Sequence, residues 1–234
     1  MLKVYGIEHI LYLLVTIIIF SVTIPLIKKK VTTEDKQNKL MKILGIILFL
    51  TVLSNRISLC IEDRSILTFF PSTYCGASSF ALSIGLLLLK RDSKLFHCVC
   101  YVGFVGGILT LIYPDFLPQD DSLFYPPTIT GLLHHTIIIY TVIVMVMTKY
   151  LQPSLKKWYL LPVGLNFYLF YGLVLITELN FSDAMYIFTP ALPDSIFNWF
   201  VLGILVLSAH GLFLYLWEYF TNRTKTQEVV VKPA

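Results

Sequence analysis

Residues 7–26 read IEHILYLLVTIIIFSVTIPL, with Glu8 as the one formally charged side chain. A helix needs about 20 mostly apolar residues to cross roughly 30 Å of hydrocarbon, so this stretch is long enough to span a membrane. It is too long for the apolar core of a signal peptide, and Lys28, Lys29 and Lys30 follow it where a cleavage site would need small residues. We therefore expect the stretch 7–26 to be retained as a membrane anchor.

Six further apolar stretches of similar length follow. The seven expected spans are residues 7–26, 40–60, 73–89, 95–113, 128–148, 158–177 and 195–217. Only 14% of the 234 residues are charged and 56% are hydrophobic, whereas about a quarter of the residues in a soluble domain are charged. This composition excludes disordered, collagen-like and disulfide-scaffold proteins. We predict an all-α polytopic membrane protein with one seven-helix transmembrane domain, residues 1–220, and a short polar cytoplasmic tail, residues 221–234.

Basic residues are concentrated on one side of the expected membrane. Fifteen of the 18 are Lys28, Lys29, Lys30, Lys36, Lys39, Lys42, Lys90, Arg91, Lys94, Lys149, Lys156, Lys157, Arg223, Lys225 and Lys232. The segments on the other side carry Glu62, Asp63, Asp115, Asp120, Asp121, Glu178, Asp183 and Asp194, with Lys3 and Arg64 as their only bases. Lys and Arg near span ends stay in the cytoplasm, so we expect the amino terminus outside and the carboxyl terminus inside a cell membrane. The net charge of +4 is a weak signal for nucleic acid, and we expect no such partner.

Ionisable side chains inside membrane spans are costly and usually face a cavity or a partner. The expected spans contain the following ionisable side chains and two amides: His9, Asn55, Arg56, Cys60, Cys75, His97, Cys98, Cys100, His134, His135, Asn166 and His210. At 1.5 Å per residue, Arg56 lies about 6 Å below the outer end of its span. Cys75 lies in the first turn of the stretch 73–89, and His134 and His135 lie roughly 10 Å deep. We expect these four residues to share the outer third of the bilayer, where His9 could join them, whereas His210 is too deep.

Cys75 has a setting that suits a nucleophile. Pro71 stops any earlier helix and Ser72 is the expected N-cap, so Cys75 becomes the third helical residue. Free N–H groups and the positive end of the helix dipole favour a thiolate there. A neighbouring His can accept the thiol proton, which is the minimal arrangement for covalent acyl transfer. The N–H of Gly76 is the expected oxyanion donor.

Other roles remain open for these residues. Cysteine often packs as a small apolar residue, and a disulfide between Cys60 and Cys75 is a second alternative. His134 and His135 could serve only as hydrogen-bonding groups between helices. Adjacent helical residues point about 100° apart, so we expect at most one of the two histidines to face Cys75.

Arg56 also has two interpretations. It can pair with Glu62, Asp63 or Asp115 in a structural role, or it can bind a phosphate or carboxylate. Soluble-enzyme motifs such as G-x-S-x-G, H-E-x-x-H and the P-loop are absent from the sequence. Cys98-x-Cys100 lacks a second ligand pair, and we expect neither a metal nor a cofactor.

Several short motifs resemble the YwaF-like family of bacterial integral membrane proteins, whose animal relatives are membrane acyltransferases acting on ether phospholipids. They are GIEHIL at 6–11, FPSTYC at 70–75, GGILTLIYPD at 106–115, LLHH at 132–135 and the proline-rich segment 179–193. The sequence departs from the family at Ser72 and Thr73, where aliphatic residues are usual, and at Asn198-Trp199-Phe200, which replaces a longer tryptophan motif. The resemblance implies a Cys-His centre in which Cys75 forms an acyl-enzyme and His135 is the base.

Two hypotheses about function follow from the sequence. The first is a lipid acyltransferase or transacylase near the outer leaflet, with Cys75 and His135 catalytic and a membrane phospholipid as the partner. Its expected substrate-binding residues are His9, Arg56, His134 and Asn166. The second is a non-enzymatic transport or binding protein, in which Arg56, His135 and Asn166 line a polar cavity for a small solute or lipid. The sequence has no internal repeat and no broken-helix pair typical of transporters, and it suggests no soluble partner.

Overall fold

The computed structural model describes residues 6–114, 117–118, 122–191 and 194–230, and all regular elements in these ranges are helices. They are α1 (Ile7–Lys30), α2 (Glu34–Glu62), η1 (Ile66–Phe69), α3 (Tyr74–Leu88), α4 (Lys94–Ile112), α5 (Pro126–Met147), η3 (Leu155–Lys157), α6 (Leu160–Leu179) and α7 (Trp199–Val230). Each apolar stretch in the sequence coincides with one α-helix. Six of these helices are long and apolar enough to cross a membrane, and α3 is a shorter apolar helix. The all-α prediction is confirmed.

Local sequence signals explain where the helices begin and end. The side chain of Thr33 caps α2 by accepting a hydrogen bond from the N–H of Lys36 at 3.4 Å. α5 begins with Pro126 and Pro127, whose missing N–H groups are not needed in the first turn. α6 ends at Asn180, which adopts the left-handed conformation common at helix ends.

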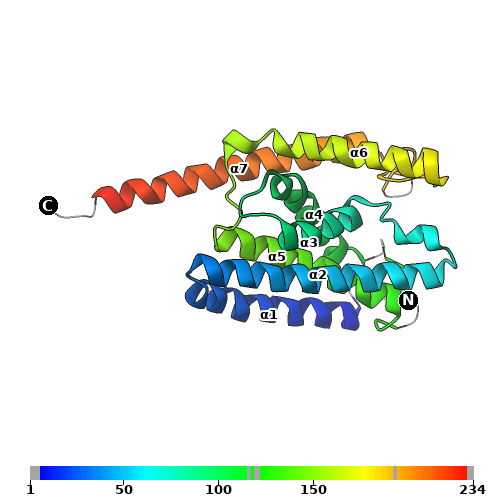
Figure 1. Ribbon diagram of the computed structural model, residues 1–234, viewed down its shortest axis with the longest axis horizontal. Helices are drawn as coiled ribbons and strands as arrows, with labels where there is room; N and C mark the ends of the chain where they lie inside the picture. The colour runs from blue at the N-terminus through cyan, green and yellow to red at the C-terminus, as the bar shows by residue number, and fades with distance from the viewer. Residues whose placement is uncertain (1–5, 115–116, 119–121, 192–193, 231–234) are drawn as a thin grey trace.

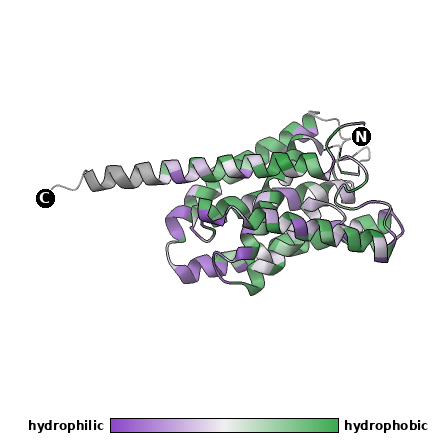
Figure 2. Cartoon of the chain, turned by 90° about the horizontal axis from the view of Figure 1, so that it is seen from above, coloured by the Kyte–Doolittle hydropathy of each residue, from purple (hydrophilic) through white to green (hydrophobic). Residues whose placement is uncertain are grey.

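The helices pack in two groups around α3 and α4. In Figure 1, α1, α2 and α5 lie along one side and α6 and α7 along the other, with α3 and α4 between them. α2 packs against α3 and α5, and α4 packs against α3, α5 and α6. In Figure 2, hydrophobic colour dominates the long helices, while hydrophilic colour gathers mainly toward the ends of the bundle. This distribution is typical of helices surrounded by lipid.

Close approach of the central helices depends on small residues in α4. A Cβ added at Gly103 would overlap the side chain of Ile138 and lie 3.2 Å from the Cβ of Ser78. A Cβ added at Gly107 would lie 2.9 Å from Ile139 and 3.2 Å from the backbone oxygen of His135. These glycines bring α4 close to α5 and, at Gly103, also to α3, because small residues let membrane helices approach closely.

The length of α3 shapes one end of the bundle. Its 15 residues span only about 22 Å, less than the roughly 30 Å of hydrocarbon that a perpendicular helix must cross. α2, in contrast, has 29 residues and continues alongside the segment that precedes α3. The amino-terminal end of α3 is therefore recessed, and Cys75 lies at that recessed end.

Candidate functional site

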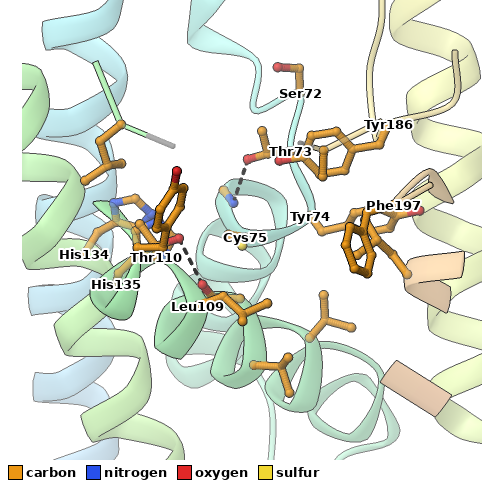
Figure 3. Close-up of a pocket in the computed structure, with 18 of the residues that line it drawn as sticks. Ser72, Thr73, Tyr74, Cys75, Leu109, Thr110, His134, His135, Tyr186 and Phe197 are labelled. Carbon is orange, nitrogen blue, oxygen red and sulfur yellow. Dashed lines mark hydrogen bonds between the residues drawn. The ribbon is translucent and has the colours of Figure 1, made fainter. Parts of the chain in front are cut away.

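A cavity of about 540 Å³ lies at the recessed end of α3. Its polar lining includes Asn55 and Arg56 from α2, Cys75 from α3, and His134 and His135 from α5. Aliphatic side chains of α4, α6 and α7 form much of the remaining wall. Figure 3 shows the two histidines entering the cavity from one side and aromatic side chains from the opposite side, with Cys75 between them in this view. Four of the sequence-predicted site residues therefore share one cavity.

The cap of α3 differs from the predicted one by one residue. Thr73, not Ser72, is the N-cap, so Cys75 is the second helical residue. The Oγ1 of Thr73 accepts a hydrogen bond from the N–H of Gly76 at 3.3 Å. This bond occupies the donor that we expected to stabilise an oxyanion, and that prediction is wrong. In the described structure no other residue accepts a hydrogen bond from the N–H groups of Tyr74 and Cys75, as is usual for the first turn of a helix.

The thiol of Cys75 is free and closely packed against α4. All four cysteines of the chain lie in the described ranges and are free thiols, so the disulfide with Cys60 is not formed. A Cβ added at Gly106 would overlap the Sγ of Cys75. Gly106 therefore leaves the space that the sulfur occupies. Within the ranges that the structure describes, Cys75 makes no hydrogen bond to either cavity histidine.

Both cavity histidines have an enclosed ring nitrogen without a partner. The Nδ1 of His134 lies 3.3 Å from the backbone oxygen of Thr130, but its Nε2 has no hydrogen-bond partner among the described residues. The Nδ1 of His135 is likewise enclosed and unpaired in the described structure. The two ring centroids are only 4.0 Å apart. Both residues line the cavity, and the expectation that at most one of them faces Cys75 stays a prediction.

Arg56 is buried on α2, with 8% of its surface exposed. Its Nη2 donates to the Oδ1 of Asn55 at 2.6 Å, while its Nε has no partner in the described part of the chain. The predicted carboxylate partners do not account for it. Neither Glu62 nor Asp63 forms an ion pair with Arg56 within the described ranges, and Asp115 lies outside the described residues. The prediction of a pair with Glu62 or Asp63 is wrong.

Two of the expected substrate-binding residues lie away from the cavity. The Nε2 of His9 donates to the backbone oxygen of Leu111 at 2.7 Å and so connects α1 to α4. Asn166 is exposed on α6, and its Nδ2 donates to the backbone oxygen of Pro162 at 2.9 Å. Neither contributes to the lining. His210 does not line the cavity either and packs on another part of α4, with its ring 4.3 Å from that of Tyr101.

The segment between α6 and α7 supplies site residues that the sequence did not predict. The N–H of Met185 donates to the backbone oxygen of Ser72 at 2.8 Å, which holds this segment against the start of α3. Met185 and Tyr186 have φ angles of 54° and 56°, a left-handed conformation that non-glycine residues seldom adopt. The turn brings Tyr186 to the cavity, 6.2 Å from the ring of Tyr74. Burial raises the pKa of Tyr186.

Asp183 holds the same segment in shape. Its Oδ1 accepts hydrogen bonds from the N–H groups of Ala184 at 2.9 Å and Phe188 at 3.0 Å, and its Oδ2 accepts one from Thr189 at 3.2 Å. One carboxylate thus orders six residues of chain beside the cavity. Such a segment has no periodic pattern of hydropathy, so the sequence did not predict that it contributes to the cavity.

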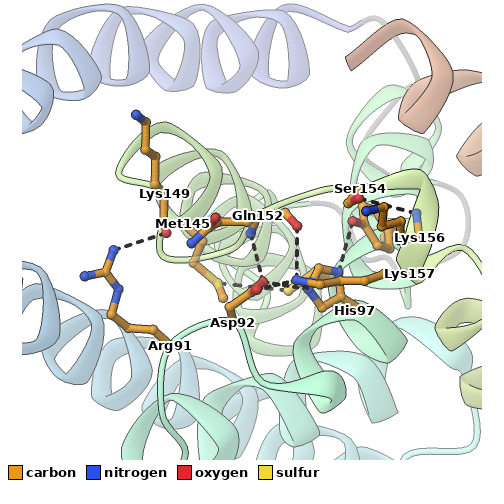
Figure 4. Close-up of polar contacts among 11 residues, drawn as sticks. Arg91, Asp92, His97, Met145, Lys149, Gln152, Ser154, Lys156 and Lys157 are labelled. Atoms are coloured by element: carbon orange, nitrogen blue, oxygen red, sulfur yellow. Dashed lines mark hydrogen bonds and ion pairs between the residues drawn. The ribbon is translucent and has the colours of Figure 1, made fainter. Parts of the chain in front are cut away.

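A separate polar cluster lies at the opposite end of α4 (Figure 4). The Nε2 of His97 lies 2.7 Å from the Oδ1 of Asp92, and the Nζ of Lys157 bonds the Oδ2 of the same carboxylate. The N–H of Gln152 donates to Asp92 at 3.0 Å. Burial acts to raise the pKa of Asp92, but the hydrogen bonds from Lys157, Gln152 and His97 outweigh burial and lower the pKa. This cluster ties two loops to α4.

All residues that line the cavity lie in the part of the sequence that matches a known protein family. No curated protein and no solved structure shows significant similarity to the chain. The model of the TMEM164 family, a membrane protein family, matches residues 4–221. The matched region includes Arg56, Cys75, His135 and the segment around Tyr186. Because it covers most of the sequence, the chain belongs to the TMEM164 family.

Proposed function

We propose that this protein is a membrane-embedded lipid acyltransferase or transacylase that forms a thioester on Cys75. The observation that supports it is the meeting of a free thiol from α3 with two imidazoles from α5 in one largely apolar cavity. Cysteine and histidine in reach of one another can split acyl transfer into two easier steps. The resemblance to YwaF-like proteins and their acyltransferase relatives supports the same assignment.

In the first step, His135 accepts the thiol proton and the sulfur of Cys75 attacks the carbonyl carbon of a phospholipid ester. The carbonyl oxygen becomes an oxyanion, for which the free N–H groups of Tyr74 and Cys75 are the available donors. The ester C–O bond then breaks, and the leaving alkoxide takes the proton from His135. The products are a lysophospholipid and an acyl thioester on Cys75.

In the second step, the hydroxyl of an acceptor lysolipid attacks the thioester carbon. His135 accepts the hydroxyl proton and returns it to the departing sulfur, which restores the thiol. The net reaction exchanges one ester for another and requires no cofactor. Neither ring nitrogen of His135 makes a hydrogen bond in the described structure, so the imidazole is not committed to another partner and can serve both proton transfers.

The cavity suits an acyl chain. Its volume of about 540 Å³ lies within the roughly 300–1,000 Å³ typical of small-molecule sites. Val102, Val105, Leu109, Leu165 and Val206 supply apolar wall to it. A chain entering from the surrounding lipid would thus remain in apolar surroundings while its ester group meets the thiol.

We further propose a membrane topology that places this cavity near the outer leaflet. α3, the third helix along the chain, would be a short span that brings the total to seven in a single domain over residues 1–220. The amino terminus would lie outside and the tail 221–234 in the cytoplasm. The charge asymmetry of the connecting segments supports this orientation in a cell membrane. Phospholipid ester carbonyls lie near the hydrocarbon boundary, at the depth that this topology gives to Cys75.

A non-enzymatic binding or transport role is the alternative, and one observation favours it. Cys75 makes no hydrogen bond to His134 or His135 within the described ranges. The enzyme accommodates the same geometry, because catalytic hydrogen bonds are often long or poorly aligned before the substrate binds.

Transfer of a labelled acyl chain decides between them. The purified full chain is reconstituted in vesicles that contain a phospholipid with an isotope-labelled acyl chain and an unlabelled lysophospholipid acceptor. We expect label to appear in the acceptor with the wild type and with Cys98→Ala, since Cys98 donates to the backbone of α6 away from the cavity. Cys75→Ala should abolish transfer. Equal transfer by Cys75→Ala and the wild type would exclude the enzyme and favour the binding role.

A further inference from the structure

Arg56 is a cation enclosed in an apolar cavity without a charged partner in the described structure. Its single hydrogen bond to a side chain is with the neutral Oδ1 of Asn55. Asp63 also lines the cavity, but the two side chains form no ion pair within the described ranges. A buried charge is costly unless an opposite charge or several hydrogen bonds compensate it. The cavity therefore has a position prepared for an anion.

The position of the guanidinium is fixed by neighbouring residues. The Nδ2 of Asn55 donates to the backbone oxygen of Pro127 at 3.3 Å and to the Oγ1 of Thr130 at 3.2 Å. Asn55 is thereby anchored to α5, and its Oδ1 holds one nitrogen of Arg56. A guanidinium carries five N–H donors, so most of its donors remain for a ligand. Arginine held in this way suits the bidentate binding of a phosphate or carboxylate.

Three enclosed polar atoms without partners belong to residues of this one cavity. They are the Nε of Arg56, the Nε2 of His134 and the Nδ1 of His135. Buried polar atoms are seldom left unpaired in proteins, and each such atom costs free energy. Their residues mark the polar part of the cavity that Cys75 also lines, and the remaining donors of Arg56 make this the part that suits a polar ligand group.

We propose that Arg56, positioned by Asn55 and flanked by His134, binds the phosphate oxyanion of a phospholipid headgroup. This inference rests on the proposed function, because it identifies the class of lipid that reaches Cys75. The phosphate and the acyl esters of a phospholipid are joined through one glycerol unit, so holding the phosphate at Arg56 restricts where the ester can lie. Arg56 is thus a positioning residue for the ester, and not a group that takes part in bond exchange.

The test measures retention of labelled palmitoyl-oleoyl phosphatidylglycerol by the detergent-solubilised full chain. All proteins carry Cys75→Ala, so that no lipid is consumed and the result does not depend on the proposed chemistry. The comparison lipid is the diacylglycerol with the same two acyl chains, which lacks the phosphate. The variants are Arg56→Gln, Arg56→Lys and Arg64→Gln, the last being an exposed arginine just beyond the end of α2.

We expect the phospholipid to be retained about ten-fold or more better than the diacylglycerol, because hydrogen bonds to charged groups contribute about 1.5–3 kcal/mol. Arg56→Gln should remove this preference, Arg56→Lys should keep part of it, and Arg64→Gln should keep all of it. Millimolar inorganic phosphate should not displace the lipid, since the acyl chains add to its binding. The comparison of the two lipids on the Cys75→Ala protein that keeps Arg56 needs no further substitution. It therefore tests the inference even if an Arg56 variant fails to fold.

Three results would overturn the inference. They are equal retention of the two lipids, full preference in a folded Arg56→Gln protein, and displacement of the phospholipid by inorganic phosphate, which would assign the site to the free ion. Acyl transfer by the wild type together with any of these results would leave the proposed function intact. Lipid binding that depends on Arg56 without acyl transfer would instead support the phosphate site and reject the enzyme.

Discussion

Gly106→Ala should damage the activity of this protein far more than its stability. The structure has the Sγ of Cys75 in the space that a Cβ at position 106 would occupy. A cysteine side chain relieves such an overlap by rotating to another staggered position about its Cα–Cβ bond. This rotation moves the sulfur by about 3 Å, because staggered positions are 120° apart.

The two consequences differ in size. A displacement of about 1 Å at a reacting group can reduce the rate about 100-fold, so a larger displacement of the sulfur should reduce acyl transfer at least as much. The stability terms nearly cancel. If the rotated sulfur is held about 30° from its new staggered position, this costs about 0.5–1.5 kcal/mol, whereas replacing Gly by Ala inside a helix gains about 0.5–1 kcal/mol.

The assay compares acyl transfer in vesicles with the thermal unfolding midpoint of the same preparation. Gly211→Ala is the matched control, because no atom lies within 4 Å of a Cβ added at that position of α7. We expect the control to keep its activity and Gly106→Ala to lose activity while unfolding near the wild-type temperature. A fully active, normally stable Gly106→Ala protein would show that Cys75 does not react from the position beside α4.

Three further predictions follow from the same geometry. Cys75→Ala and His135→Ala should each abolish acyl transfer in the vesicle assay, and the double variant should be no worse, because a nucleophile and its base act as one unit. Additive losses of activity would show that the two residues act independently. Asp92 has a lowered pKa, so its carboxylate contributes stability above about pH 4 that is lost as the pH falls through the lowered value. Asp92→Asn should therefore flatten the acid limb of the unfolding midpoint against pH, and an unchanged limb would contradict this. A tag inserted in the loop 118–122 should be labelled from outside intact cells, and protection of the tag would refute the proposed topology.

Hydropathy was sufficient to locate every α-helix, because long apolar stretches in lipid have few alternatives to helix. It also predicted a depth for each polar residue, but not the direction in which each side chain faces. His9 and Arg56 were both expected near the outer end, yet only Arg56 reaches the cavity, while His9 bonds the backbone of α4. The direction depends on how the helices rotate against one another, which glycines such as Gly107 influence through contacts distant in sequence.

Loop structure was the least predictable part of the site. The segment around Tyr186 is held by the hydrogen bond from Met185 to Ser72 and by the carboxylate of Asp183. No local sequence pattern predicts either of these contacts. The N-cap of α3 shows that the sequence also did not predict which of two neighbouring residues caps the helix. Ser72 and Thr73 both carry a hydroxyl, and only the backbone geometry brings the Oγ1 of Thr73 to the N–H of Gly76.

The central claim is that the sulfur of Cys75 carries the acyl chain. It is tested most directly by peptide mass mapping after brief incubation of the wild-type protein with phospholipid in the absence of an acceptor. We predict that the peptide containing Cys75 gains the mass of one acyl chain, that neutral hydroxylamine removes this mass as expected for a thioester, and that the peptide containing Cys98 and Cys100 stays unmodified. Acyl transfer that proceeds with no adduct on Cys75, or with the adduct on another cysteine, would contradict the account.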